Sequence, residues 1–347
     1  VTPVTDMSPV DGGGFSGDPG SPQHGKKGGK LWPVHCALAF GANNMAVGAV
    51  YLSGSMTEGF NAITFSLYRE VCAAIVLNLV TMIYWNIKPA KVDYGRLWLC
   101  GLLMCVNQLA YIWGLGTAGS VVTVCMQPLI PIFTMIMSIM KGYERGSKTK
   151  VMGIILATVG TIVMVGPGQH SDTVAGARRI KGGLLILCNT FCMALYYVFQ
   201  KPLVHKYPPV AVAGWAYLSA ITHMAVTAAV MVPRPELLVP RPLWGPLLFW
   251  IIGPSILGYA IVNWGNQRLP SSQVAMYGCL QPVLGTMMAM AFLGEKLVTR
   301  DVGALGILSG IYLVNRPGRG DSMGAPGHAL SPRGGWTPLL PRRLSKS

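Results

Sequence analysis

The distribution of charge constrains this chain more than any other feature of its sequence. Of its 39 Lys, Arg, Asp and Glu residues, only Arg69 and Glu70 lie well inside an apolar stretch. A charge at the centre of a bilayer costs about 3 kcal/mol even on lenient insertion scales, so long charge-free runs are what a membrane-spanning chain requires. Charged residues form 11% of the chain, whereas soluble domains contain about 25%. The pattern predicts an all-α polytopic membrane protein and excludes a water-soluble globule.

The apolar runs predict ten transmembrane helices. Most of them reach the roughly 20 residues that a helix needs to cross the hydrocarbon core. The connectors between them are too short to form an extramembrane domain, so no soluble catalytic module is expected. The predicted ranges are 32–52, 62–85, 97–115, 118–140, 151–166, 182–200, 210–232, 244–263, 272–293 and 302–315.

The two ends and the connectors carry almost all of the basic residues. Residues 1–31 and 317–347 are rich in Gly, Pro and Ser, and we expect both to be disordered cytoplasmic tails, the second of them basic. If the amino terminus is cytoplasmic, the cytoplasmic segments hold 19 Lys and Arg and the opposite side holds 7. The positive-inside rule therefore predicts that both termini are cytoplasmic. Because the net charge of +15 is spread over these segments, a nucleic-acid partner is not expected.

An internal repeat divides the predicted spans into two halves. The pairs Gln127-Pro128 and Gln281-Pro282 are 154 residues apart. A second series of matches, at an offset of 150, relates Gly153, Gly160 and Pro167-Gly168 to Gly303, Gly310 and Pro317-Gly318. Each half, 32–168 and 169–316, contains five predicted spans. An odd number of spans inserts the second half upside down, so we expect two inverted five-helix repeats, an arrangement that suits alternating access.

Neutral polar residues within the spans are the candidates for a solute pathway. Thr123 with Gln127, and Tyr277 with Gln281, form two polar stripes that we expect to face each other as walls of the pathway. The alternative is that these side chains only bridge helices. The neutral candidates are Asn107, Gln108, Tyr111, Thr123, Gln127, Asn189, Tyr196, Asn263, Tyr277 and Gln281. The prolines expected to kink the helices are Pro128, Pro131, Pro254 and Pro282.

Arg69 and Glu70 are the charged candidates for the same pathway. As neighbours on one helix they point about 100° apart, so they need not pair with each other. Arg69 suits a substrate carboxylate through its planar guanidinium, and Glu70 suits an amino group or a coupling proton. The alternatives are an interhelical salt bridge and snorkelling of Arg69 to the membrane surface.

The remaining features predict neither an enzyme nor a cofactor. The eight cysteines lie in apolar runs, and no His, Cys or carboxylate spacing typical of a metal site occurs at depth. No nucleophile motif is present, so no catalytic residue is assigned. Small residues on the predicted helices 151–166 and 302–315 favour close packing, either between the two halves or between two copies in a homodimer.

Three phrases carry a resemblance to a known family: NQLAYIWGL at 107–115, LQPVLGTMMAMAFLGEKL at 280–297 and GILSGIYLV at 306–314. With the ten spans, they resemble the drug/metabolite transporter superfamily and its EamA domain. The Tyr68-Arg69 step and the Leu-Gly-Glu sequence at 293–295 are similar to the plant nodulin-like group, which includes the Walls-Are-Thin-type and Umami-type proteins. The resemblance implies a multi-pass carrier of amino acids or auxin-like compounds in the plasma membrane or the vacuolar membrane.

The sequence therefore predicts a transmembrane transporter of small organic metabolites, with a small-molecule solute and the lipid bilayer as its partners. One alternative is a carrier of nucleotide sugars or sugar phosphates. Such a carrier is expected to use Lys or Arg against phosphate, and none lies within the last five predicted spans. A second alternative is a membrane scaffold that transports nothing.

Overall fold

The computed structural model describes residues 31–53, 61–165, 176–293 and 299–315. These residues are almost entirely helical, and no strand occurs among them. Apart from Leu31, the two predicted tails lie outside the described residues, as does the Gly294-Glu295 step of the Leu-Gly-Glu motif. The longer helices of the first half are α1 (Trp32–Ser53), α2 (Ala62–Tyr84), α3 (Tyr94–Ala118), α4 (Ser120–Met126), α5 (Leu129–Met140) and α6 (Lys148–Val165).

The second half repeats this order. Its longer helices are α7 (Gly176–Lys206), α8 (Pro209–Met231), α9 (Trp244–Trp250), the π-helix η4 (Ile251–Gly258), α10 (Tyr259–Arg268), α11 (Ser271–Met276), α12 (Leu280–Leu293) and α13 (Gly303–Asn315). Short 3₁₀ turns complete the described chain, namely η1 (Lys91–Asp93), η2 (Arg234–Leu237), η3 (Arg241–Leu243), η5 (Tyr277–Cys279) and η6 (Thr299–Val302).

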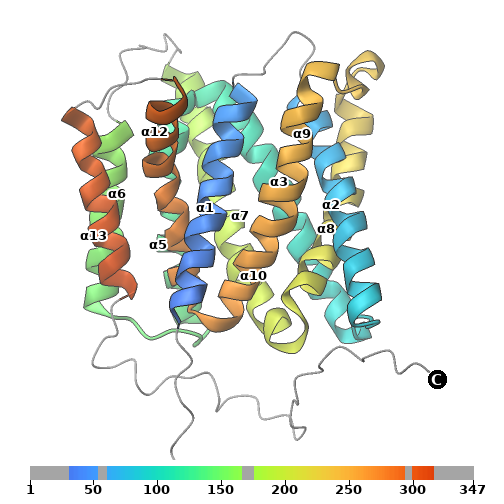
Figure 1. Ribbon diagram of the computed structural model, residues 1–347, viewed down its shortest axis with the longest axis horizontal. Helices are drawn as coiled ribbons and strands as arrows, with labels where there is room; N and C mark the ends of the chain where they lie inside the picture. Colours follow the sequence, from blue (N-terminus) through green and yellow to red (C-terminus); the bar gives the residue numbers. More distant parts are fainter. Residues whose placement is uncertain (1–30, 54–60, 166–175, 294–298, 316–347) are drawn as a thin grey trace, which may run out of the picture. The chain divides into compact units, whose positions relative to one another are not determined.

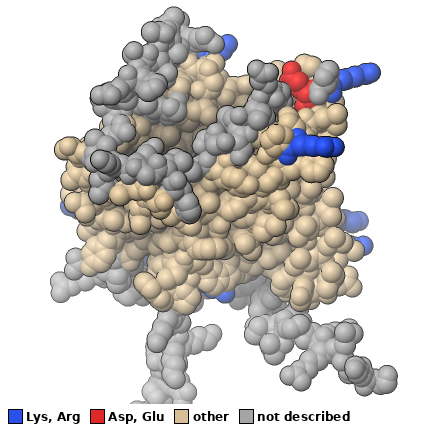
Figure 2. All heavy atoms as spheres, turned by 45° about the horizontal axis from the view of Figure 1, so that its top comes forward, with Lys and Arg blue, Asp and Glu red and all other residues tan. Residues whose placement is uncertain are grey.

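The helices have the length and composition of membrane spans. Among the described residues, seven segments are long and apolar enough to cross a membrane, and Gly303–Asn315 is a shorter apolar helix. Large apolar side chains such as Ile83, Val230 and Leu305 are more than half exposed. On the face seen in Figure 2, charged side chains are few and the broad surface between them is uncharged. Such a surface suits contact with lipid tails. The protein is thus a multi-pass integral membrane protein.

The prolines lie at or near irregular points of the predicted spans. The span predicted at 118–140 breaks into α4 and α5 at Gln127-Pro128, because proline has no N–H for the helical ladder. Pro254 lies inside the π-helical turn η4. Pro131 and Pro282 are the third residues of α5 and α12. The N–H groups in the first turn of a helix have no partner within the helix, so proline breaks no helical hydrogen bond there. The interruptions therefore lie before these two prolines rather than at them.

The packing of the helices repeats when the two halves are exchanged. Helix α7 packs on α3 and α5, and its counterpart α1 packs on η4, α10 and α12. The pairs α2 with α8 and α6 with α13 each join corresponding helices of the two halves (Figure 1). This exchange pattern is what two inverted repeats produce.

Glycines bring α6 and α13 into backbone contact. A Cβ atom added at Gly303 would lie 2.3 Å from the carbonyl oxygen of Gly160, and one added at Gly310 would lie 2.4 Å from that of Gly153. Only glycine permits so close an approach of two helices. The small-residue stripes predicted from the sequence therefore meet each other inside one chain.

Four connectors gather at one end of the helices, which we call the basic face. They are 85–93, 141–147, 207–208 and 269–270. Side-chain contacts join helix ends at this face: Asp93 accepts from Lys206 and Tyr207, and Gln267 of α10 donates to the carbonyl of Val204 of α7 at 2.7 Å. The connector 232–243 and the turn at Gly119 lie at the opposite face.

Candidate functional site

The two charged residues predicted for the pathway lie together in the protein interior. One guanidinium nitrogen of Arg69 is 3.3 Å from a carboxylate oxygen of Glu70 and donates to the amide oxygen of Gln108 at 3.2 Å. The amide nitrogen of Gln108 donates to the Ser66 hydroxyl at 3.0 Å. Arg69 is 6% exposed and Glu70 1%, so Arg69 does not snorkel to the membrane surface. Arg69 and Glu70 therefore contact each other although they are consecutive residues on α2. The bond from Arg69 to Gln108 also joins α2 to α3.

Each member of this pair keeps one polar atom without a partner. The Nε atom of Arg69 and the Oε2 atom of Glu70 are buried and have no hydrogen-bond partner. Leaving such groups unpaired inside a protein costs free energy, because neither water nor protein replaces the lost hydrogen bonds. An N–H donor and a carboxylate oxygen on neighbouring residues therefore remain without a hydrogen-bond partner at a buried position.

Aromatic side chains surround the pair. The ring of Trp250 lies 5.7 Å from the Arg69 guanidinium, and its indole nitrogen donates to the Gly48 carbonyl at 2.9 Å. Tyr217 and Tyr259 lie near enough to act electrostatically on Arg69. The sequence reasoning missed Ser66 and these three rings, because a single aromatic residue in an apolar run has no periodic signal.

A line of phenol rings continues from the pair through the second half. The rings of Tyr217 and Tyr259 are 5.2 Å apart, and those of Tyr259 and Tyr196 are 6.0 Å apart. The Tyr196 hydroxyl donates to Asn263 at 3.4 Å, and Asn263 donates to the carbonyl of Pro209 at 3.1 Å. Pro209 begins α8 at the basic face, whereas Arg69 lies in the second turn of α2, nearer the opposite face. Polar groups thus extend across much of the membrane-spanning part.

Three other predicted residues form an amide cluster between α3, α4 and α7. The side-chain nitrogen of Asn107 donates to the backbone carbonyl of Asn189 at 3.0 Å, and Asn189 returns the same bond to Asn107 at 2.9 Å. Gln127 donates to the Asn189 side chain at 3.2 Å. These reciprocal bonds fit the alternative that amides bridge helices.

We expect Asn189→Leu to lower the thermal stability of the purified protein by about 1–3 kcal/mol, because the Gln127 side chain and the backbone carbonyl of Asn107 lose the partners that the buried Asn189 amide provides. The half-buried Asn43 provides a comparison, and Asn43→Leu is expected to change stability less. Equal shifts of Tm in detergent for the two variants would contradict a specific role for the cluster.

The remaining candidates lie against other helices. The Tyr277 hydroxyl contacts His35 of α1 at 2.6 Å and accepts from Asn315 of α13 at 3.3 Å. Thr123 donates to the Gly119 carbonyl at 2.8 Å, Tyr111 is half-buried, and Gln281 is exposed. Gln127 therefore turns toward α7 and Thr123 bonds its own helix, whereas Tyr277 turns toward α1 and α13.

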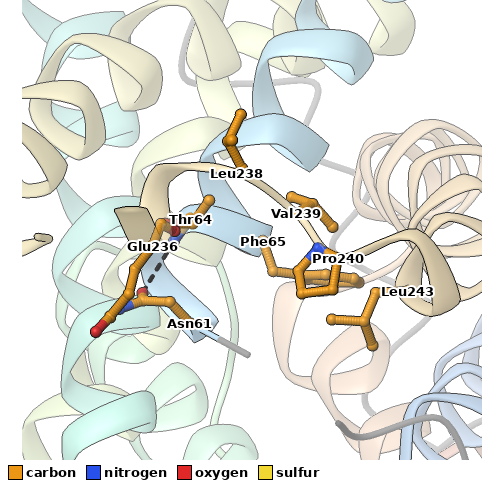
Figure 3. A pocket seen from close by; sticks show the side chains of 8 residues that line it. All are labelled: Asn61, Thr64, Phe65, Glu236, Leu238, Val239, Pro240 and Leu243. Atoms are coloured by element: carbon orange, nitrogen blue, oxygen red, sulfur yellow. Dashed lines mark hydrogen bonds between the residues drawn. The ribbon is translucent and has the colours of Figure 1, made fainter. Parts of the chain in front are cut away.

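The opposite face is covered above the start of α2. Asn61 caps α2 and donates to the Glu236 carboxylate at 2.8 Å, and Thr64 donates to the Glu236 carbonyl at 2.8 Å. Figure 3 shows the narrow recess that remains between α2 and the connector that follows Glu236. A wider recess of about 340 Å³ lies at the basic face beside Asp93, Arg96 and Phe199. Arg69 and Glu70 line neither of these two recesses, and their burial shows that the pair is enclosed.

No group of three or more His, Cys, Asp or Glu side chains among the described residues is placed to hold a metal ion. The arrangement offers binding rather than bond-making chemistry: a guanidinium and a carboxylate for opposite charges, and rings for an apolar group.

Comparison with known proteins places this geometry in context. The model of the EamA-like transporter family matches residues 34–166 and 180–316. A WAT1-related protein of Arabidopsis thaliana is 24% identical, and the match covers 76% of this chain and 80% of the relative. A probable terminal-alkyne amino-acid exporter of Streptantibioticus cattleyicolor is 25% identical over 75% of this chain and 86% of its own length. One crystal structure has a similar fold, with a TM-score of 0.68, 17% identity and coverage of 81% of this chain and 96% of that one.

Proposed function

This chain belongs to the EamA-like transporter family, and from that premise we propose that it carries amino acids or related solutes of low net charge by alternating access. The observation that carries the proposal is the enclosed Arg69–Glu70 pair with one free polar atom on each member. An α-amino acid offers a carboxylate and an ammonium group attached to the same carbon atom. The carboxylate would accept from Arg69, and the ammonium group would donate to Glu70.

The surroundings of the pair support a solute of this kind. Trp250, Tyr217 and Tyr259 provide apolar ring surface beside the two charges, which suits the side chain of an amino acid or the ring of an auxin-like carboxylate. One relative is named as a probable amino-acid exporter. A solute that carries a carboxylate alone would use Arg69 and leave Glu70 free to take a proton.

A carrier of sugar phosphates has less support. The predicted end of the sixth span at residue 200 left Lys201 in a connector, but α7 continues to Lys206 and buries Lys201 at 8% exposure. The Lys201 ammonium group donates to two backbone carbonyls of α10 and of the residue that follows it. This cation of the second half is therefore already bound within the protein, and we infer that it does not receive a phosphate.

The inverted repeats support alternating access, because exchanging the conformations of the two halves moves an opening from one face to the other. The count of 19 basic residues against 7 supports an orientation with the basic face and both termini in the cytoplasm. The plasma membrane is the location that we propose, with the vacuolar membrane as the alternative.

We expect the purified protein, reconstituted in phosphatidylcholine vesicles, to show saturable uptake of at least one neutral amino acid from a labelled panel. Uptake should be inhibited by unlabelled solutes that contain both charged groups and little affected by their amides, because an amide lacks the charge that Arg69 binds. Absence of flux for every amino acid and auxin-like acid, with a cooperative thermal transition retained, would refute the proposal.

A pH gradient across the same vesicles tests proton coupling by Glu70. If Glu70 carries the proton, the gradient should accelerate uptake of an auxin-like carboxylate by the parent, and Glu70→Gln should remove that acceleration while retaining exchange of labelled for unlabelled carboxylate, because this solute does not use Glu70 for binding. Acceleration that persists in Glu70→Gln would assign the proton to another group.

A further inference from the structure

The turn between α10 and α11, at Leu269-Pro270, is held by two buried charges from other parts of the chain. The Lys201 ammonium group, on α7, donates to the backbone carbonyls of Asn266 and Leu269. The Glu144 carboxylate, in the connector after α5, accepts from the backbone N–H of Ser272 at 3.0 Å and also from the Ser272 hydroxyl. Lys201 is 8% exposed and Glu144 is 9% exposed.

The signs of these charges match the ends of the helices that they hold. A cation lies at the carboxyl end of α10, where unpaired carbonyls concentrate negative charge, and an anion lies at the amino end of α11, where unpaired N–H groups concentrate positive charge. Such contacts are charge-assisted and stronger than neutral hydrogen bonds. They also replace the water that each charged group loses on burial. The turn therefore provides most of the partners that make burial of Lys201 and Glu144 tolerable.

The held turn lies at the basic-face end of the polar line described above. Asn263 and Tyr259 are on α10, the helix whose carboxyl end Lys201 binds, and Tyr196 is on α7 with Lys201 itself. Neutral bonds tighten the same junction: Asn266 donates to the Tyr197 carbonyl at 2.9 Å, and Ser271 donates to Asn266 at 2.7 Å. If the turn moves away, we expect this end of α10 to separate from α7. The line of polar groups would then open to the basic face.

We propose that Lys201 and Glu144 form a latch that closes the basic-face end of the solute route, and that the route opens there when the α10–α11 turn leaves them. This inference rests on the proposed transport function. Release exposes the two charges to water and to each other, so the loss of their bonds to the turn is offset by solvation. A turn whose bonds can be exchanged for solvation in this way is suited to switching. Lys201 and Glu144 are positioning residues here, because neither contacts the proposed solute.

Hydrogen exchange followed by mass spectrometry tests the latch without requiring a solute. In Lys201→Met and Glu144→Gln, amide exchange in 266–276 is expected to rise about tenfold relative to the parent, because the turn opens more often. Exchange in α6 and α13 should remain unchanged, which separates local opening from unfolding. Lys206→Met is the matched control, since Lys206 is also on α7 at the basic face but pairs with Asp93, and exchange in 266–276 should not change.

Unchanged exchange in 266–276 of both folded latch variants would overturn the proposal, as would an equal rise in Lys206→Met. A rise confined to the latch variants in a protein that shows no flux would keep the latch and refute the transport function. The two hypotheses can therefore fail separately.

Discussion

Replacing either Arg69 or Glu70 by leucine alone is expected to destabilise the protein by about 3–5 kcal/mol, whereas replacing both should recover most of that loss. Each single change leaves the other charge in the interior, where both side chains are less than a tenth exposed, without its opposite charge. The double variant removes both charges and keeps apolar volume in their place. The measurement is thermal unfolding of the purified variants in one detergent, with Leu79→Ala, a half-exposed position on α2, as the control.

Transport separates the functional role of the pair from its structural role. All three variants are expected to lose solute flux, including the double variant that folds, because the free Nε of Arg69 and Oε2 of Glu70 are removed. Arg69→Lys should fold and still bind carboxylate solutes poorly, since an ammonium group lacks the planar fork of guanidinium. Flux at the parental level in the folded double variant would show that the pair serves structure alone.

The charge pattern predicted the membrane class because the free energy of placing a charge in lipid depends on residue type and depth more than on tertiary detail. It could not predict how far helices continue beyond the hydrocarbon core. Lys201 illustrates this, because α7 extends past the apolar run and buries the residue against α10. Glu144 is a second example, because its partner Ser272 is 128 residues away in sequence.

The sequence predicted which polar residues lie within the membrane, but not which of them contact each other. The sequence identified Arg69, Gln108, Asn189 and Gln127 as polar residues at depth, but which amides meet depends on the rotation of each helix about its axis. Gln127 and Gln281 occupy equivalent positions in the repeat, yet Gln127 bonds Asn189 and Gln281 is exposed. The symmetry of the sequence therefore extends to the backbone and not to every side chain.

The contact between α6 and α13 is a further example. The sequence predicted a face of small residues on each helix, but it did not predict which surface each face packs against. We expect Gly303→Ala to destabilise the protein by about 1–3 kcal/mol. Its added Cβ would meet backbone atoms of α6, the Gly160 oxygen at 2.3 Å and the Met164 nitrogen at 2.7 Å. Backbone atoms cannot rotate away as a side chain does, so the two helices would have to separate.

Gly285→Ala in α12 is the matched control. It adds the same methyl group at a position where the new Cβ would have no atom within 4 Å. Its expected effect has the opposite sign, a gain of up to about 1 kcal/mol, since alanine favours the helix over glycine. Thermal unfolding of both variants in one detergent compares the two signs directly. If the glycine stripe instead joined two copies of the chain, Gly303→Ala would change the oligomeric state in size-exclusion chromatography and leave the unfolding of the monomer unchanged.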